Sequence, residues 1–236
     1  MRTLQYVKPT DEQLKIVSRN RPVVELIRGA AGSGKTTTAL LRLKSLIRVF
    51  RSRKEREQNT EPVRILVLTY NRTLRGYIDA LAKQVVDKTP NVDITISTFA
   101  KWAMRQLGAP QIIHKERRKS LILSLSREIS LPDKFILDEV EYVMGRFLPT
   151  ELDNYLTITR HGRGASPRVD KNLRQLLLDK VIRPYQQHID QKNLWDWNDL
   201  AVQMAEIDLT NKYDVVIVDE TQDFSANQLR AIKRQL

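Results

Sequence analysis

The sequence of 236 residues contains no cysteine, only three histidines and no long apolar run. Without cysteine it can form no disulfide, no thiolate zinc site and no cysteine nucleophile. The histidines are far apart, which favours ordinary surface or helix positions over metal ligation, and they are His114, His161 and His188. No segment approaches the roughly 20 apolar residues that span a bilayer, and the N-terminus has no apolar stretch of signal-peptide type. We therefore expect no membrane association, no structural metal and a cytoplasmic location.

Basic residues are in clear excess, with 40 Lys and Arg against 28 Asp and Glu and a net charge of +12. Such an excess favours a polyanionic partner, nucleic acid first, because neutralised phosphates release their counterions. The alternative is a solvated basic surface without a partner. The excess is concentrated in two stretches, residues 42–75 and residues 160–192. The second stretch carries Arg160, Arg163 and Arg168 and is the better candidate for a contact with a nucleic-acid backbone.

Four short apolar runs rich in β-branched residues predict strands buried on both faces, at residues 23–27, 64–69, 93–98 and 213–219. Helical patterns alternate with the first three, at residues 35–50, 71–86 and 98–107. Strand–helix alternation of this kind favours right-handed crossovers and a parallel sheet with helices on both faces. The charged segment 51–62 predicts a frayed helix end followed by a surface loop.

The strand pattern then stops for about a hundred residues. Only helical periodicity is found, over residues 115–130, 133–147 and 170–191. A helical block that interrupts a parallel sheet predicts an inserted all-helical subdomain. We expect an α/β domain formed by residues 1–103 and 196–236, with the insertion at residues 104–195.

A glycine-rich motif follows the first predicted strand and opens a helix. It has the pattern Gly-x-x-x-x-Gly-Lys-Thr from Gly29 to Thr36. In this context the glycines let backbone N–H groups surround a phosphate, and the helix N-terminus favours the negative charge. Lys35 is expected to bridge the β- and γ-phosphates and Thr36 to place its hydroxyl on Mg²⁺. The cradle residues are Gly29, Ala30, Ala31, Gly32, Ser33, Gly34, Lys35 and Thr36.

Two carboxylates follow the last predicted strand, in the segment YDVVIVDETQD. Ligands bind open parallel sheets at the carboxyl ends of the strands, so Asp219 and Glu220 are expected beside the phosphate loop. Asp219 can hold the Mg²⁺, through water, and Glu220 can activate the attacking water. Gln222 would lie just beyond, placed to sense the γ-phosphate.

The two motifs, GAAGSGKT and VDETQD, resemble those of the UvrD/Rep/PcrA branch of superfamily 1 DNA helicases. Gln13 looks like the adenine-reading glutamine of that family, and Thr37 stands where several members have an adenine-packing arginine. The segments at 65–78 and 96–103 are similar to two further family motifs, and RHGRG and DWNDL resemble parts of its helical subdomain. The resemblance implies a RecA-like fold, ATP and Mg²⁺ as ligands, and single-stranded DNA or a single/double-strand junction as partner. In a bacterium it also implies nucleoid association.

The resemblance also implies a set of DNA contacts, at Thr69, Tyr70, Asn71, Thr98, Phe99, Arg160 and Arg163. Tyr70 and Phe99 would offer rings on which unpaired bases stack. Phe99 has an alternative role, because the helix at residues 98–107 needs an apolar anchor. Ala100 stands where the family usually has a histidine, which weakens one expected contact.

The sequence ends at Leu236, shortly after the acidic motif. The resemblance implies a partner that is missing here, namely the family's second RecA-like domain with its arginine finger. We therefore expect ATP binding with poor hydrolysis by this chain alone. Our interpretation is the N-terminal ATP-binding part of a DNA helicase or translocase. Two alternatives are a nucleotide-binding regulatory module completed by a partner, and an ATPase of a nuclease or defence system on the same fold.

Overall fold

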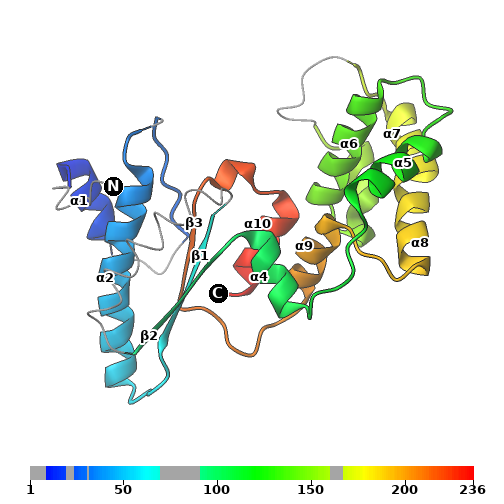
Figure 1. The fold of residues 1–236 in the computed structure, drawn as a ribbon. Helices are drawn as coiled ribbons and strands as arrows, with labels where there is room; N and C mark the ends of the chain where they lie inside the picture. Colours follow the sequence, from blue (N-terminus) through cyan, green and yellow to red (C-terminus); the bar gives the residue numbers. More distant parts are fainter. Residues whose placement is uncertain (1–8, 20–23, 31, 70–90, 160–166) are drawn as a thin grey trace. The chain divides into compact units, whose positions relative to one another are not determined.

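The structure is a computed structural model that describes residues 9–19, 24–30, 32–69, 91–159 and 167–236 (Figure 1). The chain divides into two compact units. The first comprises Met1–Thr98, Asn211–Thr221 and Leu236, and the second comprises Phe99–Thr210 and Gln222–Gln235. The predicted domain bounds differ in detail from these units and stay a proposal.

The first unit contains a parallel sheet of three described strands, in the order β2-β1-β3. The strands are β1 (Val63–Leu68), β2 (Val92–Ser97) and β3 (Val215–Val218). The central strand β1 pairs with both neighbours, and its apolar residues are almost all inaccessible to solvent. This confirms the parallel α/β class, and three of the four predicted strands lie where the apolar runs are.

The helix α2 (Lys35–Arg56) contacts β1 and β3. Its buried residues Leu40, Leu43 and Ile47 form a core with Val63, Ile65 and Val67 of β1. The helix runs six residues beyond the predicted pattern at 35–50, so the segment 51–62 begins as the end of this helix and becomes a loop after Arg56. Ion pairs at i,i+4 spacing support this extra length, Arg51 with Glu55 and Arg53 with Glu57.

The predicted strand at residues 23–27 is wrong for the residues that the structure describes there. Val24 to Ile27 are in no strand, and Val24 is 80% exposed and Leu26 61% exposed. Their composition is that of a strand, but a strand is stable only when its backbone pairs with a neighbour. The described sheet gives this segment no such neighbour.

The second unit is helical. Its helices are α4 (Phe99–Gln106), α5 (Lys115–Leu125), α6 (Asp133–Arg146), η1 (Pro149–Leu156), α7 (Lys171–Leu177), η2 (Leu178–Ile182), α8 (Arg183–Gln191), α9 (Trp197–Glu206) and α10 (Ala226–Arg234). A large apolar core joins α5, α6, η1 and α7 to α8. The predicted helix at residues 170–191 contains a π-helical turn, η2, just before Pro184, whose ring nitrogen cannot donate in a regular helical ladder.

A buried polar network fixes the start of α9. Asp196, 1% exposed, accepts hydrogen bonds from the Tyr185 hydroxyl at 2.6 Å and from Arg118 Nε at 2.5 Å. Asp199 accepts a bond from the Asp196 N–H at 2.6 Å and completes the capping box of α9. These hydrogen bonds to buried carboxylates fix the position of the first turn of α9.

No helix in the described parts of the chain is both long enough and apolar enough to cross a membrane.

Candidate nucleotide-binding site

The backbone of the phosphate loop favours glycine at motif position Gly34, and at Gly29 the Ser33 side chain leaves little room for a Cβ. Gly34, the N-cap of α2, has φ +79°, a left-handed conformation that other residues adopt only with strain. A Cβ on Gly29 would lie 2.5 Å from Ser33 Oγ. The glycines therefore permit a loop that turns tightly into a helix N-terminus, where amide groups and the helix dipole favour an anion.

Lys35, the first residue of α2, folds its side chain back over this loop. Its ammonium group donates to the carbonyl oxygens of Gly29 at 3.1 Å and Ala30 at 2.9 Å. These bonds hold a positive charge over the phosphate loop. Phosphate oxygens can replace the two carbonyl oxygens as acceptors of the ammonium N–H groups.

Thr36 and Asp219 meet although 183 residues separate them. The Thr36 hydroxyl donates to Asp219 Oδ1 at 3.2 Å, and the N–H of Asp219 donates to Leu68 O at 2.9 Å. The structure thus joins the start of α2 to the carboxyl end of β3, as the two motifs predicted. Burial raises the pKa of Asp219, and the charge of Glu220 raises it further, while the Thr36 bond and the charge of Lys35 lower it.

The other carboxylate oxygen of Asp219 fits a divalent cation. Asp219 Oδ2 is buried and has no hydrogen-bond partner among the described residues. An unsatisfied buried carboxylate oxygen is costly, and oxygen ligands of this kind suit Mg²⁺. The described residues contain no group of three or more His, Cys, Asp or Glu side chains that could hold a metal. Two protein oxygens nevertheless suffice for Mg²⁺, which usually keeps several waters and takes its remaining ligands from phosphates.

Gln13 lies against the phosphate loop. Its side-chain oxygen accepts from the N–H of Thr10 at 3.0 Å, in the capping box of α1 (Asp11–Val17). Its amide nitrogen lies 2.9 Å from the position of a Cβ on Gly34. The glutamine predicted to read the base is therefore adjacent to the cradle, on a helix that contacts α2.

Sequence reasoning missed Arg42, which is 5% exposed. Its guanidinium donates to the Val17 carbonyl at 3.0 Å and lies 3.2 Å from a Glu25 oxygen. It thereby ties the end of α1 and the segment before the loop to α2. The one available signal was an arginine among the apolar residues of the buried face of α2.

The geometry agrees with a comparison against known protein families. The model of the UvrD/REP helicase N-terminal domain matches residues 10–235. The chain belongs to the UvrD/REP helicase family. It is also similar to a probable DNA helicase II homolog of Mycoplasma capricolum subsp. capricolum, with 26% identity over 247 residues. That match covers 94% of this chain and 32% of the relative, so the chain spans about a third of the relative's length.

The remaining nucleotide-site predictions for this UvrD/REP domain concern two residues after β3 and two residues of the phosphate loop and its helix. Glu220 is exposed and has φ +53°, a left-handed backbone that is unusual for a side chain of this kind. Gln222 is exposed in the short helix η3 (Thr221–Asp223) and belongs to the second unit. Thr37 is half-buried in the first turn of α2, and Ala31 lies outside the described residues.

The predicted DNA contacts divide into three groups. Thr69 and Thr98 follow the paired ends of β1 and β2, and the N–H of Thr69 donates to Ser97 O at 3.0 Å. Phe99 is 5% exposed and packs edge to face on Trp102, with ring centroids 5.6 Å apart. Of the two roles considered for Phe99, the structure therefore has the packing one, because a buried ring offers no face to a base. Outside the described residues lie Tyr70, Asn71, Arg160 and Arg163.

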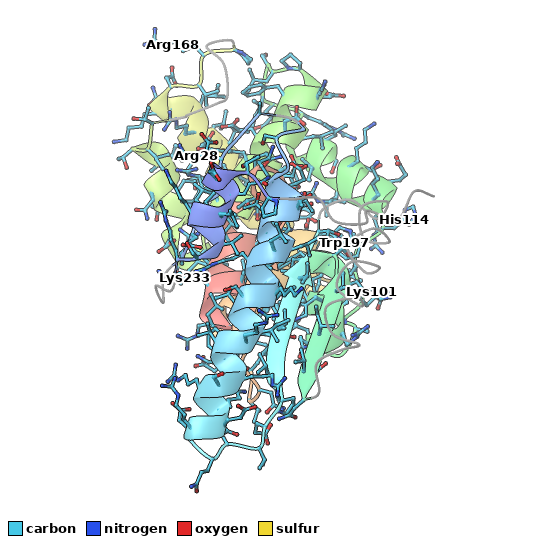
Figure 2. All side chains as sticks on the ribbon, turned by 90° about the vertical axis from the view of Figure 1, so that its left-hand side faces the viewer. Arg28, Lys101, His114, Arg168, Trp197 and Lys233 are labelled. Carbon is cyan, nitrogen blue, oxygen red and sulfur yellow. The ribbon has the colours of Figure 1, made fainter. Side chains whose placement is uncertain are left out.

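Exposed basic side chains occur on both units of the UvrD/REP domain. Figure 2 labels Arg28 of the first unit and Lys101, Arg168 and Lys233 of the second, and all four are exposed. Since each unit has cations at its surface, neither unit alone accounts for the excess of basic residues.

Proposed function

We propose that this chain is the ATP-binding part of an ATP-dependent motor that moves on single-stranded DNA. The observation that carries the proposal is the Thr36–Asp219 pair at 3.2 Å, with the second Asp219 oxygen buried and without a hydrogen-bond partner among the residues that the structure describes. A hydroxyl and a carboxylate held in this way, beside a lysine at a helix N-terminus, form the donor set of a magnesium–triphosphate site.

The proposed roles follow from the position of each side chain. Lys35 balances charge on the β- and γ-phosphates, and Thr36 and Asp219 hold the magnesium. When bound, Mg²⁺ would neutralise charge that develops on the phosphates. Glu220 takes the proton of the attacking water, and Gln222 senses the γ-phosphate.

The other residues of the proposed site bind the nucleotide and take no part in the reaction. Gly29, Ala30, Ala31, Gly32, Ser33 and Gly34 surround the phosphates with backbone N–H groups. Gln13 reads the adenine edge through its amide, and Thr37 lies beside the base. The support for Gln13 is its place against Gly34.

The proposed DNA grip lies at the carboxyl ends of β1 and β2, where Thr69 and Thr98 follow paired strands. Tyr70 would supply a ring for stacking and Asn71 a polar contact, and Arg160 and Arg163 would contact phosphates. Movement along DNA would require a second RecA-like domain that closes on ATP. The chain spans 32% of its helicase relative, which leaves room for such a domain in a longer protein.

The nucleotide site can be tested with two lysines of α2. Lys35→Ala should reduce the affinity for a fluorescent ATP analogue by at least about tenfold, because a charged donor to the phosphates is lost. Lys44 is exposed on the same helix and is not part of the proposed site, so Lys44→Ala is the matched control. Equal affinities for the two variants would refute the site. Tight analogue binding without any DNA binding at low salt would favour the regulatory-module alternative.

A further inference from the structure

A groove of about 450 Å³ lies in the helical unit, and its lining includes no residue of the phosphate loop or of the acidic motif. Its walls are the end of α6, the helix η1 and the start of α10. Three charged side chains line it, Arg146, Arg230 and Glu151, together with the polar side chains of Asn154 and Thr157. None of these residues belongs to the phosphate loop or to the acidic strand end, so the groove is a separate site.

Arg146 is the cation of the groove with the fewest polar partners among the described residues. Its guanidinium carbon lies 5.7 Å from the centre of the Tyr142 ring, a cation–π contact that orients the group. Among the described residues, no carboxylate lies within 4.0 Å of it and its side chain makes no hydrogen bond. A half-buried guanidinium therefore lines the groove with its N–H donors available.

Arg230, on α10, is held in place by hydrogen bonds and by one ion pair. One of its terminal nitrogens donates to the Arg146 carbonyl and to Asn227 Oδ1, each at 2.5 Å. Its second terminal nitrogen lies 3.5 Å from a Glu151 oxygen. That separation makes a loose ion pair, so Glu151 is a weak counter-ion that a stronger anion can replace.

Two guanidinium groups with polar donors beside them match a phosphate group, which accepts several such bonds at once. The groove is large enough for a nucleotide-sized unit. It also runs to Ile158, two residues before the basic segment RHGRGASPR at residues 160–168. Together with the net charge of +12, this favours an extended polyanion over a small one.

We propose that the groove of Arg146 and Arg230 binds the phosphodiester backbone of a nucleic-acid strand. Arg146 donates to the phosphate, Arg230 fixes the position of the second charge, and the Asn154 amide donates at the rim. This inference rests on the proposed DNA function for its ligand, but it adds a second contact region on the helical unit. Contacts of this kind fix the position of the strand and do not read its sequence.

The test compares three variants in fluorescence anisotropy with a labelled single/double-strand DNA junction, over a series of salt concentrations. Arg146→Gln should weaken binding about tenfold and reduce the slope of log affinity against log salt by about one. Arg127→Gln is the matched control, because Arg127 is an exposed arginine of the same unit outside the groove, and it should change affinity less than about twofold. Glu151→Gln removes the counter-ion and should strengthen binding.

Equal effects of Arg146→Gln and Arg127→Gln would overturn the proposal, since the loss would then be a general effect of charge. Inorganic phosphate added at constant ionic strength provides the second arm. If it protects Arg146 from a guanidine-specific reagent while Arg146→Gln leaves DNA affinity unchanged, the groove holds free phosphate and the nucleic-acid proposal fails. ATP-analogue binding, measured in parallel, separates failure of this groove from failure of the nucleotide site.

Discussion

Single side chains decide the chemistry of the proposed nucleotide site because the cradle itself is backbone. The Thr36 hydroxyl both hydrogen-bonds Asp219 Oδ1 and lies at the first turn of α2. The second oxygen of Asp219 is buried and has no donor in the part of the chain that the structure describes. A change of one hydroxyl should therefore affect metal-dependent binding far more than the stability of the domain.

Thr36→Val is expected to lower the Mg²⁺-dependent part of ATP-analogue affinity by about tenfold, because it removes one oxygen ligand. Thr36→Ser keeps the hydroxyl and should restore most of that affinity. The measurement is a titration of the analogue with and without Mg²⁺. Retained affinity in Thr36→Val together with loss of affinity in Thr36→Ser would assign the effect to packing of the threonine methyl group instead.

Elements are held in place by polar side chains at helix ends. The buried Asn227 of α10 donates to the carbonyl oxygens of Met144 and Phe147, each at 2.9 Å, and accepts from Arg230. One side chain thus satisfies the end of α6, whose last carbonyls have no partner within the helix. At the start of α9, Asp196 and Asp199 have the corresponding role for N–H groups.

Asn227→Ala should lower the free energy of unfolding by about 3 kcal/mol, because it leaves buried carbonyl groups unsatisfied. Lys233→Ala, an exposed change on the same helix, should alter it by less than about 0.5 kcal/mol. Urea unfolding followed by circular dichroism measures both. Similar midpoints for the two variants would show that the link between α10 and α6 adds little.

Asp199 should make the stability of α9 depend on pH. Its pKa is raised to about 7, mainly by burial and also by the charges of Asp196 and Asp190, against the hydrogen bond from Asp196 and the charge of Arg118. Between the unfolded value of 3.8 and 7 the folded state holds more protons, so this contribution to stability falls as pH rises through that range.

Asp199→Asn can still accept the bond from Asp196 and carries no charge. It should therefore raise the melting temperature at pH 8 by about 5 °C relative to the original chain and change it little at pH 5. Differential scanning fluorimetry across this range checks the difference. Glu128→Gln, an exposed change of the same charge, is the matched control.

At the scale of the whole molecule, charge and composition matter more than any one contact. Basic residues exceed acidic ones by 12, and exposed cations are found on both compact units. If several of them neutralise phosphates, DNA affinity must depend steeply on salt, because each neutralised phosphate releases counterions.

The affinity for a single-stranded oligonucleotide is accordingly expected to fall about tenfold or more between about 50 and 200 mM salt, as for three or more phosphate contacts. Fluorescence anisotropy at several salt concentrations gives the slope. A flat dependence would mean that the basic surface is only solvated.

The sequence by itself determined the local features of this protein. The strands β1, β2 and β3 were predicted because short apolar runs rich in β-branched residues are typical of strands buried in a parallel sheet. The phosphate loop was predicted because its residue spacing is a local requirement of backbone geometry. The segment Gly29–Thr36 and Asp219 were predicted to lie side by side, because the carboxyl ends of parallel strands meet at one edge of the sheet.

Only the tertiary structure decided how these features pair and what they bury. Val24 to Ile27 have strand composition but no described neighbour, so local propensity was not realised there. Phe99 became a packing residue because Trp102 lies beside it, and neither Arg42 nor Asn227 had a role that periodicity could reveal. Hydrogen bonds and burial between residues distant in sequence depend on the whole packing arrangement, and no local pattern records them.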